Sequence, residues 1–144
     1  MRRVVLLCGP PGAGKTTAAR QSGLPIFDRD EPQWETEAQF RRAIGALREL
    51  RGARAVVIRS GATSTARAQA TELIGATHTF VMLADRDELK RRIRARARAD
   101  KVTTLIAVNT WLERFDRRDG VQDFPGWAAL DADAAAPGVT SQEW

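Results

Sequence analysis

The chain has 144 residues, of which 43% are hydrophobic and 28% charged, a balance typical of a globular domain and not of a disordered chain. This length gives room for one hydrophobic core but not for two. A formal net charge of +5 favours a polyanionic partner such as nucleic acid. The single cysteine, Cys8, excludes an internal disulfide, and no apolar run is long enough to span a membrane. We therefore expect a cytoplasmic protein without membrane contact and without an obligate protein partner.

Short apolar runs alternate with helical patterns along the chain. Four runs have the composition of buried strands, at residues 4–7, 24–27, 55–58 and 79–83. Helical patterns follow them, at residues 15–21, 33–51, 64–74, from 85 onward and 105–118. Alternation of this kind indicates βαβ units and a parallel sheet. The predicted fold is a three-layer α/β domain, with a parallel sheet of four or five strands flanked by helices.

Two details of the helical patterns make further predictions. Phe40, Ile44 and Leu47 recur at i, i+4 and i+7, so they should form the buried face of the second helix. Ser64 is a candidate N-cap of the third helix.

The pattern weakens after residue 118. We therefore predict a domain at 1–118 and a C-terminal extension at 119–144 that is partly mobile or docked. Residues 131–138 have the composition of a mobile tail. Trp127 and Trp144 indicate that parts of the extension dock, because tryptophan is unfavourable in a fully solvated tail.

A phosphate-binding motif lies between the first strand and the first helix. The residues from Gly9 to Thr16 match G-x-x-x-x-G-K-[ST] at every position. Glycines let the backbone N–H groups turn inward toward phosphate oxygens, and a helix N-terminus adds a favourable dipole. The motif predicts a site for ATP or another nucleoside triphosphate with Mg²⁺, whose ligands are Gly9, Gly12, Ala13, Gly14, Lys15, Thr16 and Thr17. Lys15 would reach the β- and γ-phosphates, and the hydroxyl of Thr16 would hold the metal ion.

An acidic segment, Asp28-Arg29-Asp30-Glu31, directly follows the second strand. The carboxyl ends of parallel strands meet at one edge of a sheet, so this segment should lie near the phosphates. Asp28 would then help to hold the metal, Asp30 would accept the proton of an attacking hydroxyl, and Arg29 would contact the acceptor. The alternative is a solvated acidic turn that caps the next helix.

A basic helix extends from Leu89 to Arg98. At helical spacing Arg92 and Arg96 flank the apolar stripe, and both are placed to swing over a bound triphosphate. Arg91, Arg94 and Arg98 fall on the solvent side, where a charge run is usually only solvated.

The third strand ends without an acidic residue. Residues 56–58 run into Arg59-Ser60-Gly61, whereas GTPases and P-loop motors usually carry a carboxylate at the end of a second apolar strand. This absence disfavours both of those classes.

Taken together, the phosphate loop, the acidic segment and the basic helix resemble the small P-loop kinases, and among them the kinase domain of bacteriophage polynucleotide 5′-hydroxyl kinases. The resemblance implies that Asp30 is the general base, that Arg96 contacts the γ-phosphate and that Arg92 serves a neighbouring phosphate. It also implies an acceptor contact by Arg67, and for a phage-encoded chain a location in the host cytoplasm. Ser60 departs from the family, which often has an aspartate there.

The predicted function is ATP-dependent phosphorylation of a hydroxyl on nucleic acid, either at a 5′ end or on a hydroxymethylated base of DNA. Trp34 is placed to stack on a base of such an acceptor, although core packing is an equal alternative. Two other functions remain open. One is a kinase of a nucleoside, nucleotide or other small metabolite, and the other is a non-catalytic module that binds nucleoside triphosphates.

Overall fold

The computed structural model describes residues 1–95 and 101–135. Within them the chain forms a parallel sheet with the strand order β2-β3-β1-β4-β5. The strands are β1 (Arg3–Cys8), β2 (Ile26–Asp28), β3 (Arg54–Arg59), β4 (His78–Val81) and β5 (Gln122–Asp123). The predicted parallel sheet is confirmed, and it has the larger of the two expected numbers of strands.

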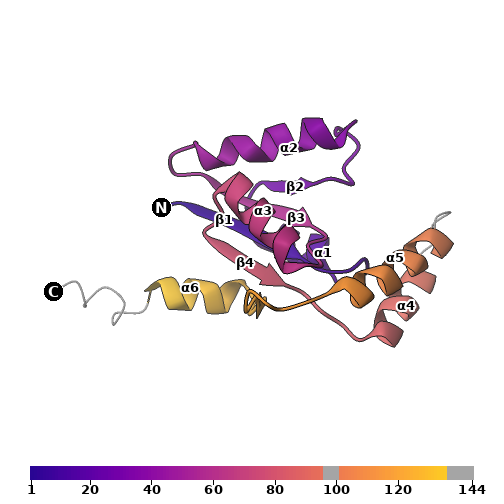
Figure 1. Cartoon of the computed structure of the whole chain (residues 1–144). Helices are drawn as coiled ribbons and strands as arrows, with labels where there is room; N and C mark the ends of the chain where they lie inside the picture. Colours follow the sequence, from indigo (N-terminus) through magenta and orange to yellow (C-terminus); the bar gives the residue numbers. More distant parts are fainter. Residues whose placement is uncertain (96–100, 136–144) are drawn as a thin grey trace.

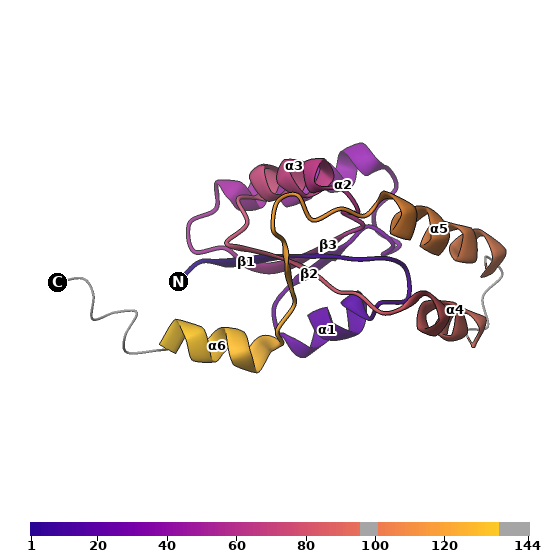
Figure 2. The ribbon, with the colours of Figure 1, turned by 60° about the horizontal axis from the view of Figure 1, so that its bottom comes forward.

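Helices cover both faces of this sheet. They are α1 (Lys15–Gln21), α2 (Glu37–Gly45), α3 (Ser64–Ile74), α4 (Arg86–Arg94), α5 (Lys101–Arg114) and α6 (Trp127–Ala135), and a 3₁₀ turn, η1 (Ala46–Arg48), follows α2. Helices α2 and α3 lie on one face and α1 and α6 on the other (Figure 2). Helices α4 and α5 pack together beyond one end of the sheet (Figure 1). The three-layer α/β prediction is therefore confirmed. None of the helices described is both long enough and apolar enough to cross a membrane.

The central strand β1 supplies side chains to both layers of the core. Val4, Leu6 and Cys8 pack with the α2 and α3 side, whereas Val5 and Leu7 pack with the α1 and α6 side. All five are 0% exposed, as expected for an uninterrupted apolar strand covered on both faces. Phe40 and Ile44 of α2 and Leu47 of η1 are buried against the first group, which confirms the predicted buried residues, although the helix ends before Leu47.

Helix boundaries differ from the predicted ones where a cap decides them. Helix α2 begins at Glu37 and not at residue 33, because Thr36 has an extended backbone and its side chain accepts a hydrogen bond from the Gln39 N–H. Thr63, and not Ser64, caps α3 by accepting from the Ala66 N–H. Helix α5 already includes Lys101, the first residue described after the gap, and it ends at Arg114, four residues before the predicted end.

The described part of the C-terminal extension, residues 119–135, packs on the rest of the chain. Strand β5 pairs with β4, and the indole N–H of Trp127 donates to the Ala18 carbonyl at 2.7 Å. Leu130 is buried on the α1 side of the sheet. Residues 131–135 continue α6, a helix that the composition did not indicate, and the mobility of the tail stays a prediction. Trp144 and the end of the predicted tail lie outside the described residues.

Candidate functional site

The phosphate loop joins β1 to α1, and its course depends on glycine at two positions. Gly9 lies close to Met82, the residue that follows strand β4. A Cβ atom on Gly9 would be 2.5 Å from the Met82 carbonyl oxygen. Gly14 precedes α1 with φ of 96°, a conformation that residues with a side chain rarely adopt. The local sequence therefore dictates the shape of the loop.

Several backbone N–H groups of this loop have no acceptor among the residues that the structure describes. They belong to Gly12, Gly14, Lys15, Thr16 and Thr17. Unpaired N–H groups at a helix start form an anion site. Ala13 differs from these predicted ligands, because its N–H donates to the Pro10 carbonyl at 3.3 Å and its side chain is buried.

Lys15 extends into the loop, and its amine donates to the carbonyl of Gly9. Desolvation lowers the pKa of this amine to about 8, against the opposing influence of the Asp28 and Asp30 carboxylates. A bound triphosphate would favour the charged form. Burial raises the pKa of the Cys8 thiol to about 11, so the thiol is neutral and packs as part of the core.

The side-chain oxygen atoms of Thr16 and Asp28 lie next to each other. The hydroxyl of Thr16 donates to Asp28 Oδ2 at 3.0 Å, and Asp28 Oδ1 accepts from the Asp30 N–H, also at 3.0 Å. Hydroxyl and carboxylate oxygens are the ligands that Mg²⁺ takes beside phosphate oxygens. The pair fits the predicted magnesium site, which stays a prediction.

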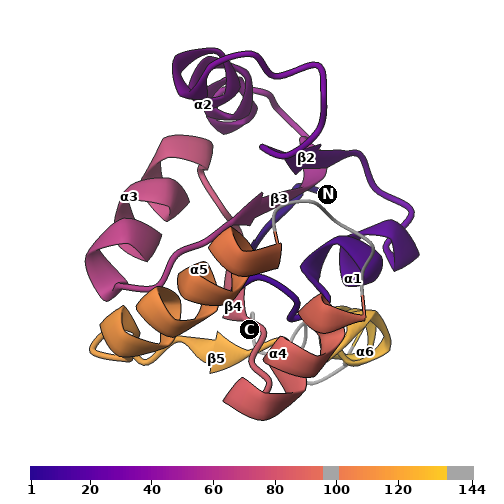
Figure 3. The same ribbon diagram turned by 90° about the vertical axis from the view of Figure 1, so that its right-hand side faces the viewer.

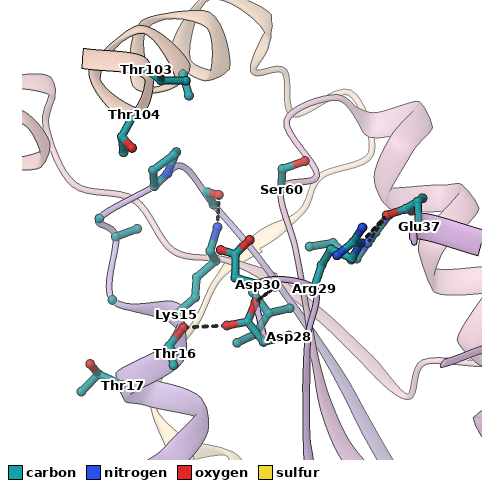
Figure 4. A pocket seen from close by; sticks show the side chains of 18 residues that line it. Lys15, Thr16, Thr17, Asp28, Arg29, Asp30, Glu37, Ser60, Thr103 and Thr104 are labelled. Atoms are coloured by element: carbon teal, nitrogen blue, oxygen red, sulfur yellow. Dashed lines mark hydrogen bonds and ion pairs between the residues drawn. The ribbon is translucent and has the colours of Figure 1, made fainter. Parts of the chain in front are cut away.

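Asp30 is exposed and points into the same cavity, beside Lys15 (Figure 4). In the part of the chain that the structure describes, no hydrogen bond or ion pair occupies its carboxylate. A free carboxylate next to the phosphate loop is available to accept a proton. The role of Asp30 as general base is a prediction that this geometry permits.

The cavity has a volume of about 580 Å³ and opens over the carboxyl ends of β1, β2 and β3. Its lining includes Arg29, as predicted, and five residues to which the sequence assigned no role: Glu37, Arg59, Ser60, Thr103 and Thr104. Arg59 is the last residue of β3 and Ser60 follows it, and a strand end of this kind is the same signal that singled out the acidic segment. The two threonines lie on α5, on the opposite side of the cavity from the β2 end (Figure 4).

Helices α4 and α5 are anchored on the phosphate loop. Ala13 packs in one apolar cluster with Leu89, Ile93 and Val108. Arg92 donates from Nη1 to the Gly12 carbonyl at 2.9 Å and from Nε to Glu88 at 2.9 Å. The structure thus brings Arg92 to the loop, whereas Arg96 lies outside the described residues. Arg91 and Arg94 are exposed, as predicted.

The Ser60 carbonyl connects the cavity to α5. It accepts from the Gly9 N–H at 3.1 Å and from the indole N–H of Trp111 at 2.7 Å. One backbone oxygen therefore ties together the phosphate loop, the end of β3 and α5.

Two predicted acceptor contacts are placed elsewhere. Arg67 is 1% exposed, and its guanidinium donates hydrogen bonds to Asp119 and to backbone carbonyls. It therefore stabilises the fold and does not line the cavity. Trp34 stacks on Phe27 and meets Phe40 edge-on, with ring centroids 6.3 Å and 5.3 Å away. Trp34 is partly buried against the core and does not line the cavity, which favours the core-packing interpretation.

No protein-family model matches the sequence, and no curated protein sequence matches it either. Several solved structures, in contrast, have a fold similar to that of this chain. A sugar kinase from Janibacter sp. HTCC2649 has a TM-score of 0.67 at 19% identity, covering 96% of this chain and 98% of that one. A gluconokinase from Sinorhizobium meliloti 1021 has a TM-score of 0.58 at 20% identity, covering 98% and 94%.

A shikimate kinase from Bacteroides thetaiotaomicron has a TM-score of 0.53 at 21% identity, covering 78% of each chain. At such identities the likeness shows the fold alone. The finer resemblance to polynucleotide 5′-hydroxyl kinases is not shown by these structures. The chain has the α/β P-loop fold of small kinases.

Proposed function

We propose that the protein is an ATP- and Mg²⁺-dependent kinase that transfers the γ-phosphate to an alcohol hydroxyl of a small metabolite. The observation that carries the proposal is the meeting of Lys15, the Thr16–Asp28 pair and the unoccupied carboxylate of Asp30 in one cavity. Each would serve a separate part of a phosphoryl-transfer reaction: phosphate binding, metal binding and proton transfer.

Each of these residues has a separate role in such a reaction. The unpaired N–H groups of the loop and Lys15 bind and orient the triphosphate. Mg²⁺, when bound, neutralises charge on the β- and γ-phosphates, and Thr16 and Asp28 would hold it. Asp30 takes the proton of the acceptor hydroxyl as the hydroxyl oxygen bonds to the γ-phosphorus, and the bond from that phosphorus to the bridging oxygen breaks so that ADP leaves. Arg92, already bonded to Gly12, is placed to contribute positive charge at the loop.

A small acceptor fits the cavity better than nucleic acid. Its volume of about 580 Å³ lies within the ordinary range of small-molecule sites, and α5 bounds it opposite the strand ends. The similar structures include kinases named for a sugar, gluconate and shikimate, which are small hydroxylated acceptors. The observation in favour of nucleic acid is the net charge of +5, which by itself is a weak indication.

Transfer from labelled ATP to a panel of acceptors tests the proposal. The panel contains sugars, sugar acids, nucleosides, nucleotides, 5′-hydroxyl oligonucleotides and hydroxymethylated DNA. We expect transfer to a small acceptor, and we expect Asp30→Asn to lower it by about 10²–10⁴-fold with ATP affinity nearly unchanged, because only the proton acceptor is removed. Asp133→Asn, an exposed carboxylate on α6, is the matched control.

Two results would contradict the proposal. Normal transfer by Asp30→Asn would remove Asp30 from the reaction. ATP binding without transfer to any acceptor would instead identify a non-catalytic module, and preferential transfer to the oligonucleotides would restore the nucleic-acid acceptor.

A further inference from the structure

Two arginines line the part of the cavity that lies at the carboxyl ends of β2 and β3. Arg29 lies between the two carboxylates of the β2 turn, and Arg59 is the last residue of β3. Both line the cavity beside the phosphate loop. Their positions follow from the parallel pairing of β2 with β3, which brings the ends of the two strands together.

Arg59 is held in a fixed orientation. Its guanidinium lies over the ring of Phe40, with 5.2 Å between Cζ and the ring centroid, and the side chain is 21% exposed. Stacking of this kind fixes the plane of the guanidinium at little further cost in entropy. The cation is therefore preorganised.

One carboxylate, that of Glu37, is shared by both arginines. Glu37 Oε2 accepts from Nη2 of Arg59 and Oε1 from Nη1 at 3.4 Å, and Oε1 is 3.5 Å from Nε of Arg29 (Figure 4). The hydrogen bond from Arg59 lowers the pKa of Glu37, so that carboxyl is charged at neutral pH. At this part of the cavity the two positive charges of Arg29 and Arg59 are thus balanced by only one negative charge, that of Glu37.

The other charged groups of the cavity already have partners in the proposed reaction. Lys15 faces the triphosphate, Asp28 faces the metal site and Asp30 faces the reacting hydroxyl. The excess positive charge of Arg29 and Arg59 over Glu37 is left for the acceptor.

The two guanidinium groups also retain hydrogen-bond donors. Each carries five N–H donors. Among the described residues, Arg29 donates from Nη1 to the Trp34 carbonyl, and Arg59 donates only to Glu37. A planar fork of donors matches a carboxylate or a phosphate far better than a lone hydroxyl, and the match is charge-assisted.

We propose that Arg29 and Arg59, braced by Glu37, form an anion subsite, so that the acceptor is a hydroxylated compound that also carries a carboxylate or a phosphate. This inference rests on the proposed function and names the acceptor class for it. Since Arg29 adjoins Asp30 in the chain, the anionic group is bound close to the hydroxyl that is phosphorylated.

Matched pairs of acceptors test the subsite. D-gluconate is compared with D-sorbitol and shikimate with its methyl ester, each pair differing in the anionic group. Sorbitol 6-phosphate and a 5′-hydroxyl oligonucleotide represent phosphate from a small molecule and from nucleic acid. Binding is measured by calorimetry in the presence of Mg²⁺ and a non-hydrolysable ATP analogue, and transfer is measured by ADP release.

We expect at least one anionic probe to bind and react better than its neutral counterpart. Arg59→Met and Arg29→Met should raise its Kd and KM by about 10–100-fold, the loss expected for a charge-assisted hydrogen-bonded pair, and leave ATP affinity unchanged. Methionine removes the guanidinium that lies over Phe40 and leaves an unbranched apolar side chain in its place. Arg54→Met is the control, because Arg54 is an exposed arginine at the opposite end of the same strand.

The outcomes separate this inference from the proposed function. Binding of an acid that depends on Arg59, without transfer, supports the subsite and refutes the kinase. Transfer without preference for any anionic probe over its neutral counterpart, or an acid preference that survives in both variants, overturns the subsite and leaves the kinase standing. Preference for the oligonucleotide alone overturns the small-molecule acceptor.

Discussion

Removal of the carboxylate of Asp119 is the most informative test of how the C-terminal segment supports the fold. Asp119 accepts two hydrogen bonds from Arg67, from Nε at 3.0 Å and from Nη2 at 2.8 Å. Arg67 is 1% exposed, whereas the side chain of Asp119 is 33% exposed. The substitution Asp119→Ala therefore leaves a buried cation without its nearest counter-charge.

The structure sets the size of the effect. Breaking a buried ion pair costs about 3–5 kcal/mol when one partner is removed. Here the backbone carbonyls of Gly61, Ala62 and Asp116 still accept from Arg67, and water reaches the position that Asp119 vacates. We therefore expect the free energy of unfolding to fall by about 2–3 kcal/mol, which lowers Tm by roughly 6–10 °C.

Urea and thermal unfolding measure this change, and Asp123→Ala is the matched control. Asp123 pairs with Arg117 at 2.7 Å, but their side chains are 70% and 39% exposed, so we expect a loss below about 1 kcal/mol. Equal effects of the two substitutions would refute the argument that burial of Arg67 determines the cost.

The pH dependence of unfolding gives a second readout of the same pair. Arg67 holds the pKa of Asp119 below its ordinary value of 3.8. A lowered pKa in the folded state means that the stabilisation is complete above that ordinary value and is lost as the pH falls through the folded-state value. The wild-type protein should therefore lose more stability on acidification below about pH 4 than Asp119→Ala does. Parallel acid profiles would contradict this assignment.

Two further substitutions test local contacts. Gly9→Ala would place Cβ against the Met82 carbonyl, and we expect the displaced loop to lower ATP affinity by at least about tenfold in calorimetry; wild-type affinity would show that the loop tolerates the shift. Trp127→Phe removes the indole hydrogen bond to the Ala18 carbonyl, and urea unfolding should show a loss of about 1–2 kcal/mol with ATP affinity unchanged; no loss would mean that water replaces the indole without cost.

The phosphate loop and the strand before it could be predicted from the sequence because both are local. Glycine spacing determines the turn from Gly9 to Gly14, and an uninterrupted apolar run identifies a strand covered on both faces. The acidic segment was found by the same kind of rule, since the strand ends of a parallel sheet lie at one edge. The pairing of Thr16 with Asp28 follows from this rule.

Other features depend on residues that meet only in the folded chain. Glu37 and Arg59 are 22 positions apart, and Arg67 and Asp119 are 52 apart, so no pattern of neighbouring residues links them. The alanine-rich composition after residue 118 concealed helix α6, which packs on the sheet through Leu130 and Trp127.

For this protein the sequence by itself determined that a triphosphate cradle sits on a parallel α/β sheet, since glycine conformations and apolar periodicity are properties of short segments. The tertiary structure decided what faces the cradle. It buried Arg67, which the resemblance had assigned to the acceptor, packed Trp34 against Phe27 and Phe40, and brought Arg59 and Glu37 to the cavity wall. The physical reason is that burial and charge pairing depend on the packing of whole elements, which local patterns do not encode.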